Sequence, residues 1–221
     1  MKRIIFRVFA VLFFICSLAP VMPAEGQVPQ DVVTVATVTA TGLSVDVPVS
    51  IRDVSGTPLG IDQPPGSRIQ SYSIKVTYSP ASSVSSVTFT RAGITSSLTP
   101  TFEASPASAG TVSLLDTFQE STNLIPFTLN AAAPGNQVAH LTFQLAPSVV
   151  PGSTITLTLD PVLTELTDEG GVTKETTTLG NLALVNGAIN VSSALAVPAL
   201  GTWMLIALAA ALALVAIRMT L

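Results

Sequence analysis

The stretch Gly42–Ile51 reads GLSVDVPVSI, and every second residue from Leu43 to Ile51 is aliphatic. Successive side chains of a β-strand point to opposite faces, so this alternation predicts a strand with one buried face and one solvated face. Proline has no N–H to donate to a neighbouring strand, and Pro48 therefore predicts an edge position or a β-bulge. A strand of this kind needs partner strands from elsewhere in the chain.

The same alternation recurs along the chain. It is clear at 72–78, 139–145, 155–159 and 189–191, and weaker at 32–38, 84–90, 111–115 and 125–129. Two further segments, 162–166 and 172–178, flank Asp168-Glu169-Gly170-Gly171, which is typical of a tight turn. No segment between residues 27 and 192 has a convincing helical period. The pattern predicts an all-β protein, an antiparallel β-sandwich of eight to ten short strands.

Both ends of the chain are apolar in ways that are typical of export signals. Residues 1–26 begin with basic residues, continue with an apolar run and end in small residues, as a secretory signal peptide does. Residues 199–217 carry no charge and would form about 28 Å of helix, against a bilayer core of about 30 Å. We therefore expect a signal peptide at 1–26, one domain at 27–192 and a tail at 193–221 with a transmembrane helix at about 199–217.

The tail resembles a known sorting signal. It is similar to the C-terminal sorting tails of Gram-negative bacteria that are named for their Ile-Pro-Thr-Leu motif. The residues that carry the match are Val197, Pro198, Ala199, Leu200, Trp203 and Arg218. Ala199 stands where the motif has Thr, and Arg218 stands where a basic cluster is usual. The resemblance implies an exported protein that is held in the inner membrane until an exosortase-type membrane protease removes the tail, and that then reaches the cell surface or the medium.

Four stretches resemble cohesin domains, the extracellular modules of cellulose-degrading assemblies. In chain order they are Gly42–Ile51, Tyr72–Pro80, Gly135–Leu145 and Asn186–Val191. They are similar to the family's opening strand, its strand ending in Tyr-Asp-Pro, its Gly-x-x-Ala-x-x-x-Phe strand and its closing Asn-Gly-x-Ile-x-Val, although Ser79 replaces the Asp. The resemblance implies a nine-stranded jelly-roll sandwich that binds a dockerin-like or other protein partner, catalyses nothing and needs no cofactor.

The charge and the reactive residues of the domain exclude several functions. Five basic and twelve acidic residues give residues 27–192 a net charge of −7, which disfavours nucleic acid as a partner. The single histidine, His140, has no Gly-x-Ser-x-Gly elbow to serve, and the only cysteine, Cys16, lies in the signal peptide. Neither a catalytic site nor a zinc site is expected. Calcium binding stays open at the acidic residues near the late hairpin, which are Asp160, Glu165, Asp168, Glu169 and Glu175.

A sheet face is the expected binding surface. The outward positions of two predicted strands carry short or uncharged side chains, apart from Lys75. The candidate residues are Ser73, Lys75, Thr77, His140, Thr142 and Gln144, continued by Ser71 and Val138. Such side chains lose little entropy on binding, which favours a flat contact with a protein. The alternatives are a carbohydrate- or exopolysaccharide-binding module and a structural envelope component. Sugar binding is disfavoured because Tyr72, Tyr78 and Phe143 fall at core positions instead of forming a stacking platform.

Overall fold

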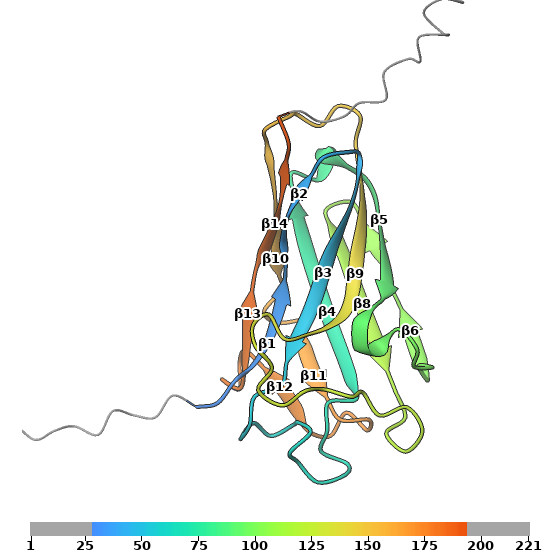
Figure 1. The fold of residues 1–221 in the computed structure, drawn as a ribbon, viewed down its shortest axis with the longest axis vertical. Helices are drawn as coiled ribbons and strands as arrows, with labels where there is room; N and C mark the ends of the chain where they lie inside the picture. Colours follow the sequence, from blue (N-terminus) through green and yellow to red (C-terminus); the bar gives the residue numbers. More distant parts are fainter. Residues whose placement is uncertain (1–27, 194–221) are drawn as a thin grey trace, which may run out of the picture.

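Residues 28–193 of the computed structural model form an elongated sandwich of two β-sheets (Figure 1). The all-β prediction is thereby confirmed. The predicted signal peptide and the predicted transmembrane helix lie outside the described residues. Within residues 28–193, no helix has the length and hydropathy to cross a membrane.

The smaller sheet has five strands. In spatial order they are β13 (Leu182–Val185), β1 (Asp31–Val35), β3 (Ser44–Arg52), β9 (Asn136–Leu145) and β5 (Val84–Arg91). β3, which contains most of the alternating stretch Gly42–Ile51, pairs with β9 over nearly its whole length. Aliphatic residues alternate along both strands, so one face of this sheet is buried against the second sheet.

The larger sheet has nine strands and is centred on β4 (Ser71–Ser79). One edge of β4 pairs with β8 (Thr111–Thr117), which carries β6 (Phe102–Ala104) and β7 (Ala107–Ser108). Different parts of β4 also pair with β10 (Thr154–Leu159) and β11 (Glu165–Thr167). The sheet continues from β10 to β14 (Gly187–Val191) and β2 (Thr37–Ala40), and from β11 to β12 (Lys174–Thr176). Two short 3-10 turns, η2 (Ala81–Ser83) and η3 (Gly93–Thr95), complete the elements.

The first and last strands change sheets together. β1 and β13 pair in parallel in the smaller sheet, and their continuations β2 and β14 pair in parallel in the larger one. The change occurs at Ala36 in one chain segment and at Asn186 in the other. An added Cβ at Gly187 would lie 2.3 Å from the carbonyl oxygen of Ala36, so only glycine fits here. The prediction of a wholly antiparallel sandwich is wrong for these two pairs, because local alternation carries no information on strand direction.

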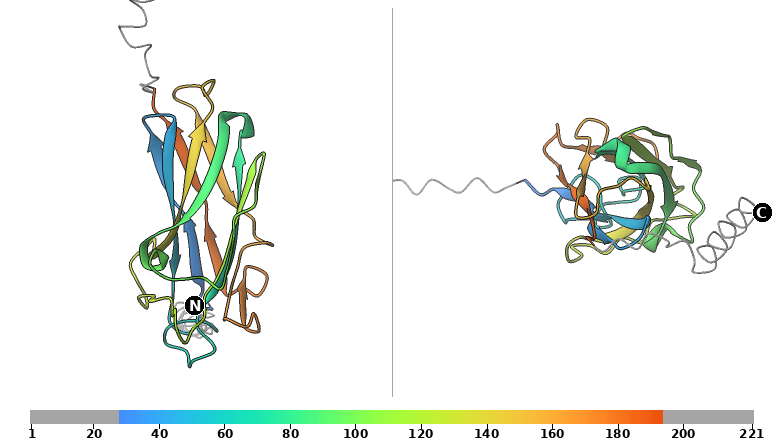
Figure 2. Two further views of the ribbon diagram at one scale, coloured as in Figure 1. Left: turned by 90° about the vertical axis from the view of Figure 1, so that its right-hand side faces the viewer. Right: turned by 90° about the horizontal axis from the view of Figure 1, so that it is seen from above.

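The core lies between the two sheets and is built by the predicted alternation. Tyr72, Ile74, Val76 and Tyr78 of β4 point inward, as does Phe143 of β9. The rings of Tyr78 and Phe143 meet edge to face with centroids 5.6 Å apart. Viewed along the long axis, the strands surround this interior (Figure 2). The contact joins the central strands of opposite sheets and fixes which side chains of β4 and β9 point outward.

Pro48 lies where β3 loses one neighbour. The pairing of β3 with β1 ends at Val49, and the N–H of Ala36 donates to the carbonyl oxygen of Pro48 at 3.0 Å as the first strand leaves the sheet. The register with β9 also shifts between Val49 and Ser50. Both predictions for Pro48 therefore apply. From Val49 onward β3 pairs with β1 as well as β9, whereas before Val49 it has lost β1 and lies at the edge of the sheet. The predicted irregularity lies next to Pro48, between Val49 and Ser50.

Three local predictions are wrong. Residues 125–129 form no strand, although Ile125 and Phe127 are buried. Val162 lies in an exposed turn, and the late hairpin is shorter than predicted, with β11 pairing β12 from Glu165 to Thr167. Val138 is fully buried instead of pointing to solvent, because Ala92 and Thr95, at the turn η3, bond its carbonyl oxygen and bring that turn over this end of β9.

Candidate functional site

The six candidate face residues do not form one surface. Ser73, Lys75 and Thr77 lie on β4 in the nine-stranded sheet, whereas His140, Thr142 and Gln144 lie on β9 in the five-stranded sheet. Since Tyr78 and Phe143 of the same strands meet in the core, the alternate residues point away from each other. The sandwich therefore has two candidate faces, which we call the β4 face and the β9 face.

The β4 face consists of rows of hydroxyl side chains with apolar residues among them. In register, Lys75 lies beside Ser113, Thr77 beside Thr111 and Thr158, and Ser73 beside Leu115. Leu115 is half-buried, and Phe102, which pairs with Thr117 in the next row, is 54% exposed. The turn after β10 adds Leu163, which is 48% exposed and whose carbonyl oxygen accepts from Ser73 Oγ at 3.0 Å.

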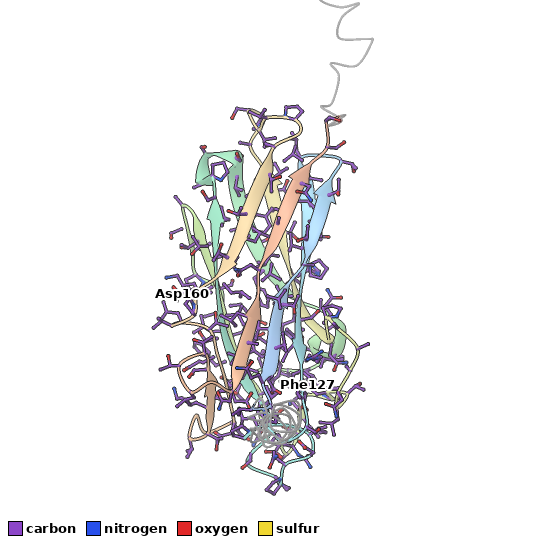
Figure 3. The ribbon with its side chains drawn as sticks, turned by 90° about the vertical axis from the view of Figure 1, so that its left-hand side faces the viewer. Phe127 and Asp160 are labelled. Carbon is purple, nitrogen blue, oxygen red and sulfur yellow. The ribbon has the colours of Figure 1, made fainter. Side chains whose placement is uncertain are left out.

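The only charged residue among the six candidates is neutralised locally. Lys75 Nζ lies 3.6 Å from Asp160 Oδ2. Asp160 follows the end of β10 on the flank of the sandwich (Figure 3), and it also accepts from the N–H groups of Val162 and Leu163. These backbone hydrogen bonds, together with Lys75, lower the pKa of Asp160. The turn that presents Leu163 is thus fixed beside the β4 face by a charged cap.

The β9 face is polar and hydrogen-bonded within itself. Thr142 Oγ1 donates to Asp46 Oδ1 at 2.5 Å, and Gln144 Nε2 donates to Ser44 Oγ at 2.9 Å. His140 lies half-buried beside Pro48 and Thr90. Among the described residues of β3 and β5, the strands on either side of β9, no large apolar side chain is exposed on this face. Around β9, the face therefore offers a partner few apolar anchors.

The acidic residues of the late hairpin do not converge. Glu165 pairs with Lys174 at 3.2 Å, Asp168 accepts from the N–H groups of Val172 and Thr173, and Glu169 accepts from the N–H of Glu120. Asp168 thereby holds the turn of the hairpin. Among residues 28–193, no group of three or more His, Cys, Asp or Glu side chains has an arrangement that could hold a metal ion. The hairpin gives no support to the calcium hypothesis.

Glu175 instead points into a buried acidic cluster that the sequence did not reveal. Asp31, Asp53 and Glu175 are all fully buried, and each uses one oxygen to accept a backbone N–H of the loop after β3, from Val54, Ile61 and Leu59 respectively. The second oxygen of each has no hydrogen-bond partner. Burial, followed by the charge of Glu175, raises the pKa of Asp31 to about 9. Asp31 and Glu175 titrate as a coupled pair, and the pair retains a proton at neutral pH that can lie between the two carboxyl groups.

Most aromatic side chains among residues 28–193 are internal. Tyr72 and Phe143 are buried, Tyr78 is 5% exposed, and Phe127 packs near the lower end of the sandwich (Figure 3). Tyr72 donates to buried Asp116 at 2.8 Å, and burial raises the pKa of this carboxyl to about 6. Among residues 28–193, Phe102 is the one aromatic side chain exposed to solvent to a large degree. A single ring does not make a platform for stacking sugars.

Sequence reasoning missed the apolar residues of the β4 face. A signal for one of them is present: Leu114 and Leu115 are consecutive, and in a strand one of two consecutive leucines must point outward. Phe102 and Leu163 lie in segments without alternation, and only the tertiary structure brings them beside β4. The predicted sorting residues, Val197 to Trp203 and Arg218, lie outside the described part of the chain.

Three solved structures are similar to this fold, and two of them are described as cohesins. The sixth cohesin of scaffoldin B from Acetivibrio cellulolyticus, in complex with a Cel5 dockerin mutant, is 18% identical, with a TM-score of 0.51 over 74% of this chain and 99% of that chain. CaCohA2 from Clostridium acetobutylicum, in complex with CaDoc0917, is 22% identical, with a TM-score of 0.52 over 74% of this chain and 100% of that chain. The third cohesin of ScaC from Acetivibrio cellulolyticus, in complex with the ScaB dockerin, is 16% identical, with a TM-score of 0.53 over 74% and 99%.

These likenesses confirm the predicted cohesin-like fold. No protein-family model matches the sequence, and no curated protein matches it.

Proposed function

We propose that this chain is a non-catalytic, exported binding module that recognises a protein partner through the β4 face. The fold supports this proposal, since two of the three similar structures above are described as cohesins in complex with a dockerin. A dockerin-like module or another protein with a flat, partly apolar surface is the partner that fits such a face. The sorting tail would deliver the module to the cell surface or the medium, with an exosortase-type protease as its processing partner.

The observation that carries the choice of face is the exposure of Phe102 and Leu163 beside a hydroxyl-rich surface. Interfaces gain most of their affinity from a few apolar or aromatic anchors that become fully desolvated. Burying about 100 Å² of exposed apolar surface contributes about 2.5 kcal/mol. The serine and threonine side chains around these anchors can exclude water at a small cost in side-chain entropy. The β9 face has the short polar side chains without the anchors.

The two faces can be tested against each other with one substitution on each. Thr77→Arg and Thr142→Arg both place a long cation on the outward side of a central strand. The full-length chain, solubilised in mild detergent and immobilised, would be exposed to secreted proteins of its native host. We expect Thr77→Arg to abolish capture of the partner that the unaltered chain retains, and Thr142→Arg to leave capture unchanged.

Melting temperatures of both variants should equal that of the unaltered chain, because both positions lie at the surface. Loss of capture in Thr142→Arg alone would assign the interface to the β9 face. Capture that survives both substitutions and fails when the Asp168 turn is altered would move the site to the hairpin.

A further inference from the structure

A hollow lies on the outer face of the five-stranded sheet, away from the β4 face. Its volume is about 520 Å³, and its lining includes Val32, Arg52, Pro134, Ala183 and Val185. A second hollow of about 350 Å³ shares Val32, Arg52 and Ala183 with it and extends toward Val28. The two form one continuous groove, which we call the Arg52 groove. Val28 and Val185 are 64% and 46% exposed, so its apolar walls are open to solvent.

Arg52 stands out among the cations of the domain. Arg68, Lys75, Arg91 and Lys174 each pair with an acidic side chain. Arg52 forms no such pair within residues 28–193, and its Nε is buried without a hydrogen-bond partner. A guanidinium held in an apolar setting loses hydration and gains from a carboxylate that reaches it. The groove therefore combines apolar walls with one positive charge that has no ion-pair partner among residues 28–193.

The groove also borders a free sheet edge. In register, Ala183 of β13, Val32 of β1 and Arg52 of β3 form one row across the outer face, and β13 is the terminal strand of its sheet. An edge strand presents backbone N–H and C=O groups that another strand can pair with. Strands in a sheet lie about 4.8 Å apart, so a strand added to β13 would lie about 14 Å from β3. A glutamate and an arginine extended toward each other over Val32 and Ala183 bridge this span, whereas an aspartate falls short.

We propose that the Arg52 groove binds an extended segment of a partner protein that pairs with β13 and places a glutamate on Arg52. The residues two positions before and after the glutamate would fill the apolar walls. The pairing with an edge strand requires a polypeptide, which separates this occupant from a fatty acid or another small carboxylate. The site lies on the sheet opposite the β4 face, so it is independent of the proposed function.

The test uses immobilised synthetic peptides with the sequence Val-Thr-Glu-Thr-Val and two relatives in which the glutamate is replaced by glutamine or aspartate. The full-length chain in mild detergent is passed over them. We expect the glutamate peptide to bind, and the glutamine and aspartate peptides to bind about tenfold more weakly or not at all. Arg52→Gln and Val185→Lys should each cause the same loss. Thr88→Lys, exposed on the far edge of the same sheet, should bind like the unaltered chain.

If Arg52→Gln fails to fold, Val185→Lys still tests the groove, because Val185 is exposed and its replacement does not disturb the core. Equal binding of the three peptides, or binding that Arg52→Gln and Val185→Lys leave intact, would overturn the proposal. The proposal would also be overturned if the chain failed to bind the glutamate peptide at millimolar concentration. Light scattering that shows self-association lost in Val185→Lys would assign the groove to a second copy of the chain instead.

Discussion

Three acidic side chains of this domain are buried away from water. Asp31, Asp53 and Glu175 are buried together, and no cation among residues 28–193 pairs with them. A buried carboxylate without a partner is costly, and the usual response of a protein is to hold a proton. Burial raises the pKa of Asp31, Asp53 and Glu175, which indicates that this cluster beside the loop after β3 binds protons more tightly than free carboxyl groups do.

This arrangement predicts a stability that falls as pH rises. The pKa of Asp31 is about 9 in the folded state against an ordinary 3.8, so the folded state holds more protons than the unfolded state between these values. Stability is then greatest at the acidic end of the window and is lost toward pH 9. We expect the melting temperature to decrease by at least about 3 °C between pH 5 and pH 8, measured by circular dichroism.

Asp31→Asn should remove most of this dependence and raise the melting temperature at pH 8. Asparagine keeps the acceptor for the N–H of Val54 and offers an N–H toward Glu175, as protonated Asp31 does. Asp46→Asn, on the exposed β9 face, is the matched control and should change nothing. If added calcium raises the melting temperature of the unaltered chain at pH 8, then a cation and not a proton neutralises the cluster.

At the scale of elements, the paired change of sheets by β1–β2 and β13–β14 depends on one missing side chain. A Cβ at Gly187 would meet the backbone oxygens of Ala36 and Val35 at 2.3 and 2.5 Å. Backbone in the middle of two ladders cannot move aside as a flexible side chain can. The close approach of the two segments at this point holds both sheets in their relative position.

Gly187→Ala should therefore destabilise the domain by about 1–3 kcal/mol or more, measured by urea unfolding. Gly42→Ala is the control, because nothing lies within 4 Å of an added Cβ there and its φ is not positive. That change should be neutral or raise the unfolding free energy by up to about 1 kcal/mol. Equal effects of the two substitutions would show that the strands do not approach closely at Gly187.

The elements that could be predicted from sequence are those with a buried and a solvated face. β3, β4, β9 and β10 have that pattern and were predicted within a few residues. β13 reads LALV without clear alternation, and its strand conformation comes from pairing with β1. Residues 125–129 alternate but have no strand to pair with, and the side chain of Gln70 holds the N–H of Ile125 instead. Pattern specifies a face, whereas pairing is decided by partners distant in the chain.

At the scale of the whole molecule, the same limit explains why six residues that were predicted to share one face lie on two sheets. Alternation identified correctly that Lys75 and Thr142 point outward. It could not indicate that β4 and β9 belong to opposite sheets, because that depends on hydrogen bonds of each strand with segments distant in the chain. The contact between Tyr78 and Phe143 across the core separates the two halves of the predicted face. The apolar anchors and the Arg52 groove arise only at this scale.

The segment Gln27–Ser192 should be soluble and monomeric without the two predicted signals, because its apolar strand faces are already covered within the sandwich. Its circular dichroism spectrum should show β-structure without the minima of α-helix. Sedimentation velocity checks the monomer, and the detergent-solubilised full-length chain provides the reference spectrum. Substantial helix in the isolated segment would contradict the all-β fold.

The position of β14 also determines when the domain can close during synthesis. This last strand lies between β10 and β2 in the larger sheet, and its predecessor β13 completes the smaller one. Until residues up to Val191 have emerged, β2 lacks its partner and β10 has an open edge. A chain that is threaded across a membrane from its N-terminus must therefore keep both sheets unfinished until nearly the whole domain has crossed. In an exported chain, folding would thereby be delayed to the far side of the membrane, where premature closure could no longer block passage.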